Sequence, residues 1–284
     1  MKKTVSIICP LYNAEKYILN LNKNLIKQKN VDIEEIIYMY TESKDNTENI
    51  LKENKLKYEL VKKGEFSHSL TREKAAFKAK GDILVFVTQD VIPEKDNWLY
   101  ELVNPIIEGE AEACFSRQIC TNNAIEKYTR EKNYPEKSRI VSKEDIEKLG
   151  LNTFFFSDAS SAIDKKIFKK LNGYDGENLP TNEDMYIAYK LIQNGYKIKY
   201  CSKSEVIHSH DFSFKEQYER YRLTGMFFKN NSYLDNFGTT KSGGGLAKYV
   251  LKRAFQDKNI KVILKFVPNM AARYIGMKVG KKNG

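Results

Sequence analysis

Short apolar runs alternate with amphipathic segments over the first ninety residues of the chain. The apolar runs are rich in β-branched and aromatic residues and read as strands, and the segments between them repeat apolar residues at helical spacing. Asp45 is a suitable N-cap for the second helix, and Gly81 ends the third. The predicted strands cover 4–10, 34–40, 57–63 and 82–88, and the predicted helices cover 14–28, 45–54 and 69–80.

The alternation is looser after residue 90 but keeps both kinds of element. We expect a helix from about 182 to Gly195 and, after "SEVIHSH", one more long helix. Further elements are a helix over 95–108, a strand over 111–117, a polar stretch over 121–150 and an aromatic run over 152–163. The order predicts an α/β protein with a mixed, mostly parallel sheet flanked by helices.

The end of the chain differs in charge from the rest. Residues 241–245, "KSGGG", are the clearest predicted linker. Of the formal net charge of +11, the segment Leu246–Gly284 supplies +9, from ten basic residues and one acid. Apolar residues recur there at helical spacing, at Ile260, Ile263, Leu264 and Val267. A basic amphipathic helix favours a membrane surface or the protein's own body as partner over nucleic acid.

Composition excludes several classes of protein. A hydrophobic fraction of 41% with 30% charged residues is typical of a soluble globular protein, and no apolar run reaches the roughly 18 residues that a membrane span needs. The start lacks a signal-peptide cleavage pattern, so we expect a cytosolic protein. The cysteines form no C-x-x-C pair, which favours reduced, mostly buried thiols; they are Cys9, Cys114, Cys120 and Cys201.

Polar clusters follow each of the first four predicted strands: "CPLYN", "TESKDNT", "GEFSHSLTRE" and "TQD". Ligands of open α/β sheets bind at the carboxyl ends of strands, so four such clusters predict a polar rim at one sheet edge. No glycine-rich dinucleotide or phosphate-binding loop follows the first strand. A nucleotide at this rim would be held by side chains and a turn.

The ordered motifs resemble a known family. "VSIICPLYNAEKYI", "SKDNT" and "NEDM" are similar to the inverting family 2 glycosyltransferases with the GT-A fold, and "FSHSLTRE", "GDILVFVTQD", "FSDASSAIDKKIF" and "VIHSH" resemble bacterial rhamnosyltransferases of that family. The resemblance spans roughly residues 4–230. It implies a catalytic domain over 1–240, with a nucleotide-binding half to about 90 and an acceptor half after it, and a linker with a basic helical tail over 241–284.

The resemblance also implies a metal site. Asp90 stands at the last acid of the family's D-x-D motif, here Thr88-Gln89-Asp90. Mg²⁺ or Mn²⁺ prefers carboxylate oxygens and would stabilise charge on a departing diphosphate. A second ligand is expected from "VIHSH", with His208 preferred over His210. Taken alone, such an Asp could end a buried strand and such histidines could be surface residues.

Two acids and a set of rim residues complete the implied site. Asp184 matches the general base that takes the proton of the acceptor hydroxyl, and Glu183 would orient the site, although acids at a helix start often serve only as caps. The family usually has a base-binding Asp where this chain has Tyr40. Donor-binding residues implied by the match are Pro10, Tyr12, Asn13, Tyr40, Thr41, His68, Thr71, Arg72 and Gln89.

The leading hypothesis is a metal-dependent, inverting glycosyltransferase at the cytoplasmic membrane surface. It would use a nucleotide sugar such as dTDP-L-rhamnose to extend a polysaccharide or a lipid-linked oligosaccharide. Three alternatives stay open: a family 2 transferase that uses a UDP- or GDP-sugar, a nucleotidyltransferase, and a non-catalytic nucleic-acid-binding protein. The missing glycine-rich loop argues against the second, and the confinement of positive charge to the tail argues against the third.

Overall fold

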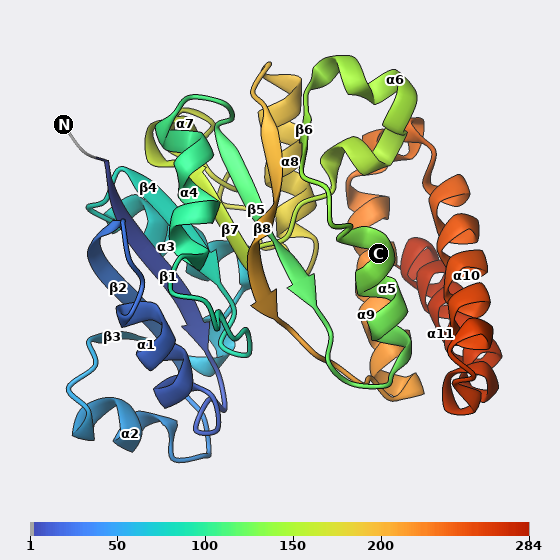
Figure 1. Ribbon diagram of the computed structural model, residues 1–284, viewed down its shortest axis with the longest axis horizontal. Helices are drawn as coiled ribbons and strands as arrows, with labels where there is room; N and C mark the ends of the chain where they lie inside the picture. The colour runs from blue at the N-terminus through green and yellow to red at the C-terminus, as the bar shows by residue number, and fades with distance from the viewer. Residues whose placement is uncertain (1–2, 284) are drawn as a thin grey trace.

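The computed structural model describes residues 3–283, with side chains of 239–243 left out, and Figure 1 shows its arrangement. One sheet runs through the molecule in the order β3-β2-β1-β4-β7-β5-β8-β6. The pairs β1–β2, β1–β4, β2–β3 and β5–β8 are parallel, and the rest are antiparallel, which confirms a mixed, mostly parallel sheet. The strands are β1 (Thr4–Leu11), β2 (Asp32–Thr41), β3 (Tyr58–Val61), β4 (Ile83–Val87), β5 (Ala113–Ile119), β6 (Arg139–Val141), β7 (Ser160–Asp164) and β8 (Ile198–Ile207).

Helices cover both faces of the sheet (Figure 1). One apolar core lies under α1 and α4, and a second lies under α3, α7 and α8. The helices are α1 (Ile18–Ile26), α2 (Thr47–Glu53), α3 (His68–Lys78), α4 (Trp98–Ile107), α5 (Ile125–Asn133), α6 (Ile146–Leu149), α7 (Lys165–Lys170), α8 (Glu183–Gln193), α9 (Phe214–Asn230), α10 (Thr239–Gln256) and α11 (Ile260–Asn283).

The local predictions agree with these elements, with three differences. Helix α3 ends at Lys78 with Ala79 as its C-cap, and not at Gly81. Helix α2 takes Asn46, not Asp45, as its N-cap. The Asp45 carboxylate instead accepts hydrogen bonds from the Thr47 hydroxyl and the Glu15 backbone N–H, which ties two loops of the rim together. Helix α10 runs through residues 241–245, so the predicted linker is wrong: the backbone is helical there despite its glycines. The boundary of a catalytic domain near 240 stays a prediction.

The chain after β4 makes a crossing that shapes the carboxyl edge of the sheet. Ile92 pairs with Ile207 at the end of β8 in an antiparallel bridge, with N–H to O distances of 2.9 and 3.0 Å. In the sheet, β7 and β5 lie between β4 and β8. The bridge therefore places the segment after β4 at the end of β8, beyond the two strands β7 and β5.

The basic tail packs on the body as two helices. Val250, Ala254 and Val262 form a small apolar cluster with Ile125 and Tyr128 of α5, and α11 lies beside α9 (Figure 1). Glycines allow the α9–α11 contact: an added Cβ at Gly280 would lie 2.0 Å from the Arg222 carbonyl oxygen, and one at Gly276 would lie 2.4 Å from that of Tyr218.

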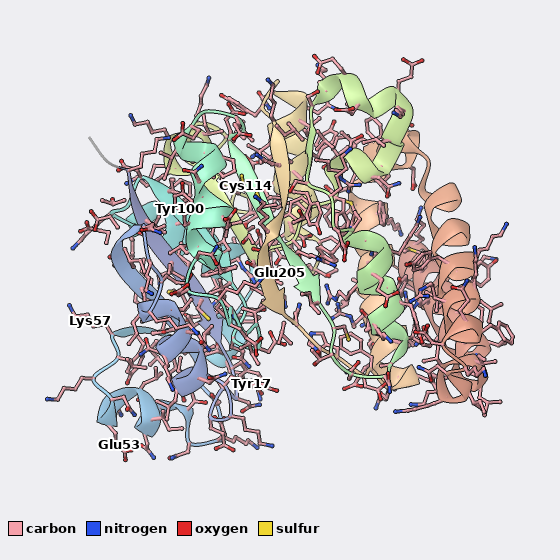
Figure 2. The ribbon with its side chains drawn as sticks, viewed as in Figure 1. Tyr17, Glu53, Lys57, Tyr100, Cys114 and Glu205 are labelled. Atoms are coloured by element: carbon pink, nitrogen blue, oxygen red, sulfur yellow. The ribbon has the colours of Figure 1, made fainter. Side chains whose placement is uncertain are left out.

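Two composition-based predictions can be compared with the structure. All four cysteines are buried and free, as expected, and Cys114 lies within the sheet (Figure 2). Among residues 3–283, no helix combines the length and the apolar character that crossing a membrane would require.

We expect Gly280→Ala to destabilise the packed tail. The added methyl would force two helix backbones apart, and overpacking of this kind lowers the free energy of unfolding by about 1–3 kcal/mol. Gly245→Ala is the matched control, because no atom lies within 4 Å of its added Cβ and alanine favours a helix. Thermal unfolding followed by circular dichroism measures both. Equal or higher stability of Gly280→Ala would contradict the close contact.

Candidate active site

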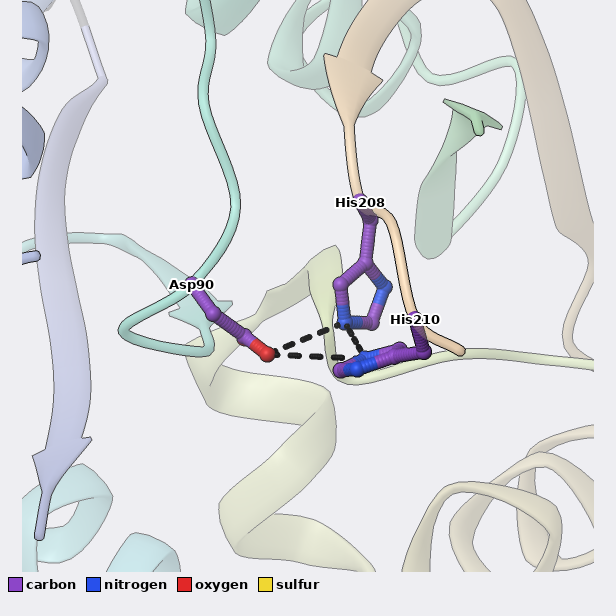
Figure 3. Close-up of side chains that lie close together, drawn as sticks. All are labelled: Asp90, His208 and His210. Carbon is purple, nitrogen blue, oxygen red and sulfur yellow. Dashed lines mark hydrogen bonds and ion pairs between the residues drawn. The ribbon is translucent and has the colours of Figure 1, made fainter. Parts of the chain in front are cut away.

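Asp90, His208 and His210 converge at the carboxyl edge of the sheet (Figure 3). The Asp90 Oδ2 atom lies 3.5 Å from His208 Nε2 and 3.4 Å from His210 Nε2, and the two Nε2 atoms are 2.7 Å apart. In the sequence, the two histidines are separated from Asp90 by more than a hundred residues. The structure brings all three predicted metal ligands together.

The three atoms fit a divalent cation. Their separations are those of neighbouring ligands around one ion with bonds of about 2.1 Å. One carboxylate oxygen and two imidazole nitrogens form a mixed donor set, which differs from the all-oxygen shell that Mg²⁺ prefers. Within the described residues, three protein ligands would leave the remaining positions to substrate and water.

Gln118 fixes which nitrogen of His208 is free. The Arg130 guanidinium, which can only donate, bonds Gln118 Oε1, so this atom is the amide oxygen. His208 Nδ1 lies 2.8 Å from the same oxygen and must therefore carry the proton. The lone pair of His208 is then on Nε2, the atom that faces Asp90. Partners of this kind hold a ligand's orientation and tautomer.

The surroundings of Asp90, His208 and His210 determine whether these side chains carry protons at neutral pH. Burial opposes ionisation of the Asp90 carboxyl, but its interaction with His208 outweighs burial, and the pKa of Asp90 is lowered. Burial is the main cause of the lowered pKa of His208, and burial also lowers the pKa of His210, to about 4. At neutral pH the site thus offers a carboxylate and two neutral imidazoles, which are the protonation states that bind metals.

The two predicted catalytic acids lie in different surroundings at the start of α8. Glu183 is buried and receives a hydrogen bond of 3.1 Å from Arg72, which is itself 2% exposed. Asp184 is half-buried, and its side chain accepts a bond of 2.8 Å from the Met185 backbone N–H. Burial, followed by the charges of Glu183 and Asp158, raises the pKa of Asp184 well above its usual value. A carboxylate with a raised pKa is a stronger base.

The first loop of the rim is fixed to the loop after β4. Gln89 Oε1 accepts from the Tyr12 N–H and Gln89 Nε2 donates to the Tyr12 carbonyl oxygen, each at 2.8 Å. Gln89 is thus engaged by the backbone, and its predicted contact with the donor stays a prediction. Tyr12 is 41% exposed, Asn13 has a left-handed φ of 49°, and Pro10 is half-buried at the end of β1.

Tyr40 or Thr41 was expected to replace the family's base-binding Asp by stacking or hydrogen bonding, and the position of Tyr40 does not suit stacking. Its ring is 3% exposed and packs edge-on against Tyr58 at 5.6 Å, so neither face is open to a ligand. Thr41 is also buried, and its hydroxyl has no hydrogen-bond partner among the described residues. Tyr12 is an exposed aromatic ring on this part of the rim.

The α3 residues divide between surface and interior. His68 is exposed at the start of α3. Thr71 is 4% exposed, and its hydroxyl accepts from the Ser67 N–H at 3.2 Å. Arg72 bonds Glu183 and the His68 carbonyl oxygen. A diphosphate contact by Arg72 would require this buried ion pair to open.

Sequence reasoning missed four residues that shape the site. Gln118 and Arg130 orient His208, and Asp158 lies buried where Tyr174 and Ser161 donate hydrogen bonds to it at 2.8 and 2.7 Å. Arg220 on α9 is exposed, with its guanidinium over the ring of Phe212. Only "FSDASSAI" carried a signal, because an acid within an apolar run needs a partner.

Comparison with known proteins identifies related chains. The family model "Glycosyl transferase family 2" matches residues 6–172. The O-antigen chain rhamnosyltransferase WbaN of Salmonella anatum is 30% identical over 97% of this chain and 89% of its own length. RfbN of Salmonella typhimurium, also described as an O-antigen chain rhamnosyltransferase, is 31% identical over 98% of this chain and 89% of its own.

Solved structures share the fold. A mannosyltransferase from Pyrobaculum calidifontis, in complex with GDP-Man and Mn²⁺, aligns with a TM-score of 0.63 at 13% identity, over 99% of this chain and 87% of that one. TarS residues 1–349 from S. aureus, in complex with UDP-GlcNAc, align with a TM-score of 0.58 at 18% identity, over 98% and 90%.

We expect Gln118→Leu to weaken Mn²⁺ binding about 10–100-fold, because His208 loses the acceptor that fixes its tautomer. Titration of the protein with Mn²⁺, followed by electron paramagnetic resonance of the free ion, measures the affinity. Ser157→Ala is the control: Ser157 accepts from Gln118 Nε2 and does not contact the amide oxygen. Wild-type affinity in Gln118→Leu would exclude this orienting role.

Proposed function

The chain belongs to the family 2 glycosyltransferases and has their GT-A fold, and we propose that it transfers L-rhamnose from dTDP-L-rhamnose to a hydroxyl of a growing cell-surface polysaccharide or lipid-linked oligosaccharide. The observation that carries the catalytic part is the convergence of Asp90, His208 and His210 on one point. The choice of sugar is supported by the two relatives, which match almost the whole chain.

The proposed reaction is a single displacement at C1 with inversion. Asp184 accepts the proton of the acceptor hydroxyl as its oxygen forms the new bond to C1, while the bond from C1 to the diphosphate oxygen breaks and its electron pair leaves with the diphosphate. A Mn²⁺ or Mg²⁺ ion bound by Asp90, His208 and His210 would stabilise charge on the diphosphate. Glu183 is neutralised by Arg72, so it positions the start of α8.

The nucleotide is placed by the rim loops in this proposal. Tyr12 offers an exposed ring for the base, and Gln89 holds the Tyr12 backbone. Tyr40 stands where the family usually has an Asp that binds the base. Because Tyr40 is buried, no side chain replaces that contact at this position. Donors with UDP or GDP are therefore the alternatives to test alongside dTDP.

The second part of the proposal is a peripheral position on the cytoplasmic face of the membrane. The outward face of α11 is apolar, and we call its residues Ile260, Leu264, Val267, Ala271 and Tyr274 the apolar stripe. Leu264 is 73% and Val267 71% exposed, whereas Ile263, expected in this face, packs inward with α5 and α10. Exposed lysines flank the stripe, including Lys258 and Lys278. Apolar residues among lysines fit an anionic lipid surface.

A donor panel tests the catalytic proposal. With Mn²⁺ and a saccharide acceptor, we expect the greatest nucleotide release from dTDP-L-rhamnose among dTDP-, UDP- and GDP-sugars. Asp184→Asn should lower the rate about 10²–10⁴-fold because the base is lost. Since burial raises the pKa of Asp184, release by the wild type should decline as the pH falls through that raised value.

Asp96→Asn is the matched control for that experiment, since the side chain of Asp96 is half-buried on the surface and paired with Lys29. It should release nucleotide at the wild-type rate. If the wild type cleaves no nucleotide sugar in the panel, the proposed function is wrong. If a UDP- or GDP-sugar is preferred, the rhamnose assignment fails and the reaction type stands.

Vesicle binding tests the membrane proposal. We expect the wild type to sediment with vesicles of phosphatidylglycerol and phosphatidylcholine, and less at high salt because surface charges are screened. Leu264→Glu should abolish this binding. Ile26→Glu on α1 is the control, because Ile26 is 64% exposed but far from the basic tail in sequence. Unchanged sedimentation of Leu264→Glu would rule out the apolar stripe as the contact.

A further inference from the structure

Besides the proposed metal ion, the diphosphate of a sugar nucleotide has no cationic contact among the predicted residues. Arg72 was expected to face it, but its guanidinium is 2% exposed and paired with Glu183 at 3.1 Å. Arg130 is also engaged, with Gln118 and with the Tyr134 hydroxyl at 3.5 Å. Both arginines therefore organise the protein around the site and have acceptors of their own.

Arg220 is different, because its guanidinium has no acceptor within the described part of the chain. Its carbon Cζ lies 4.4 Å from the ring centre of Phe212, a contact that orients an arginine and leaves its N–H groups unused. The Phe212 ring stacks on His210, with centres 4.7 Å apart and planes at 18°. These contacts leave the guanidinium within about 9 Å of the His210 ring, a separation comparable to the screening length at physiological salt.

The charge of Arg220 acts on the space around the candidate metal ligands. The Arg220 guanidinium lies on the Phe212 ring, which stacks on His210, so its positive charge is one aromatic ring away from a candidate metal ligand. In agreement with this position, the guanidinium contributes to the lowered pKa of His208 and His210, after burial, which is the main cause at both.

We propose that Arg220 binds the diphosphate of the sugar nucleotide beside the site formed by Asp90, His208 and His210. Arginine presents paired N–H donors that match phosphate oxygens, and such charge-assisted bonds are strong. As the bond from C1 to the diphosphate oxygen breaks, negative charge grows on the diphosphate, and Arg220 stabilises it. Phe212 holds the guanidinium in place. The assignment rests on the proposed function, since it presumes a diphosphate substrate.

Binding of inorganic pyrophosphate in the presence of Mn²⁺ tests this assignment without the base or the sugar. By isothermal titration calorimetry, we expect Arg220→Ala to bind pyrophosphate at least about tenfold more weakly than the wild type, and Arg220→Lys to fall between them because it keeps the charge. Arg222→Ala is the matched control, since Arg222 lies on the same helix and pairs with Glu219. It should bind as the wild type does.

Equal affinity in Arg220→Ala and Arg222→Ala would overturn the assignment, and so would absence of pyrophosphate binding by the wild type. Circular dichroism of each variant checks that the fold is kept. A wild type that binds pyrophosphate through Arg220 but cleaves no nucleotide sugar would refute the proposed function and leave this anion site standing. A wild type that cleaves a donor at a rate unchanged in Arg220→Ala would refute the anion site alone.

Discussion

Two backbone hydrogen bonds between Ile92 and Ile207 determine where chemistry can occur in this chain. They bring the segment that follows Asp90 to the end of β8, although β7 and β5 lie between β4 and β8 in the sheet. His208 follows Ile207 directly, so its imidazole meets the Asp90 carboxylate. Without this crossing, the acid and the histidines would stand at separate strand ends and could not share one ion.

The charged residues around Asp90, His208 and His210 have different roles. Arg72 neutralises Glu183 inside the protein, which leaves Asp184 as the acid whose raised pKa suits proton transfer. Arg130 acts through Gln118 on the tautomer of His208. Arg220 packs its guanidinium on Phe212 and has no acceptor among the residues that the structure describes. The tail belongs to the same arrangement, because α11 packs through glycines on α9, the helix that carries Arg220.

Much of the fold could be predicted because its signals are local. Apolar periodicity defined the strands and helices of the first ninety residues, and the polar clusters at strand ends indicated one functional edge. The burial of Arg72 and Tyr40 could not be predicted, since it depends on packing between α3 and α8 and between β2 and β3. Gln118 stands in a strand without any motif, and its role follows only from its contacts. The helical glycines of α10 were misleading because tertiary packing outweighs a propensity of about 1 kcal/mol per residue.

The central claim is that one dication is held by Asp90, His208 and His210. Pulsed electron paramagnetic resonance of Mn²⁺ bound to the protein tests it directly, because the modulation of the spin echo reports nitrogen atoms in the coordination shell. The account predicts couplings from two imidazole nitrogens, reduced to one in His210→Gln. A Mn²⁺ signal without nitrogen coupling would place the ion elsewhere and contradict the account.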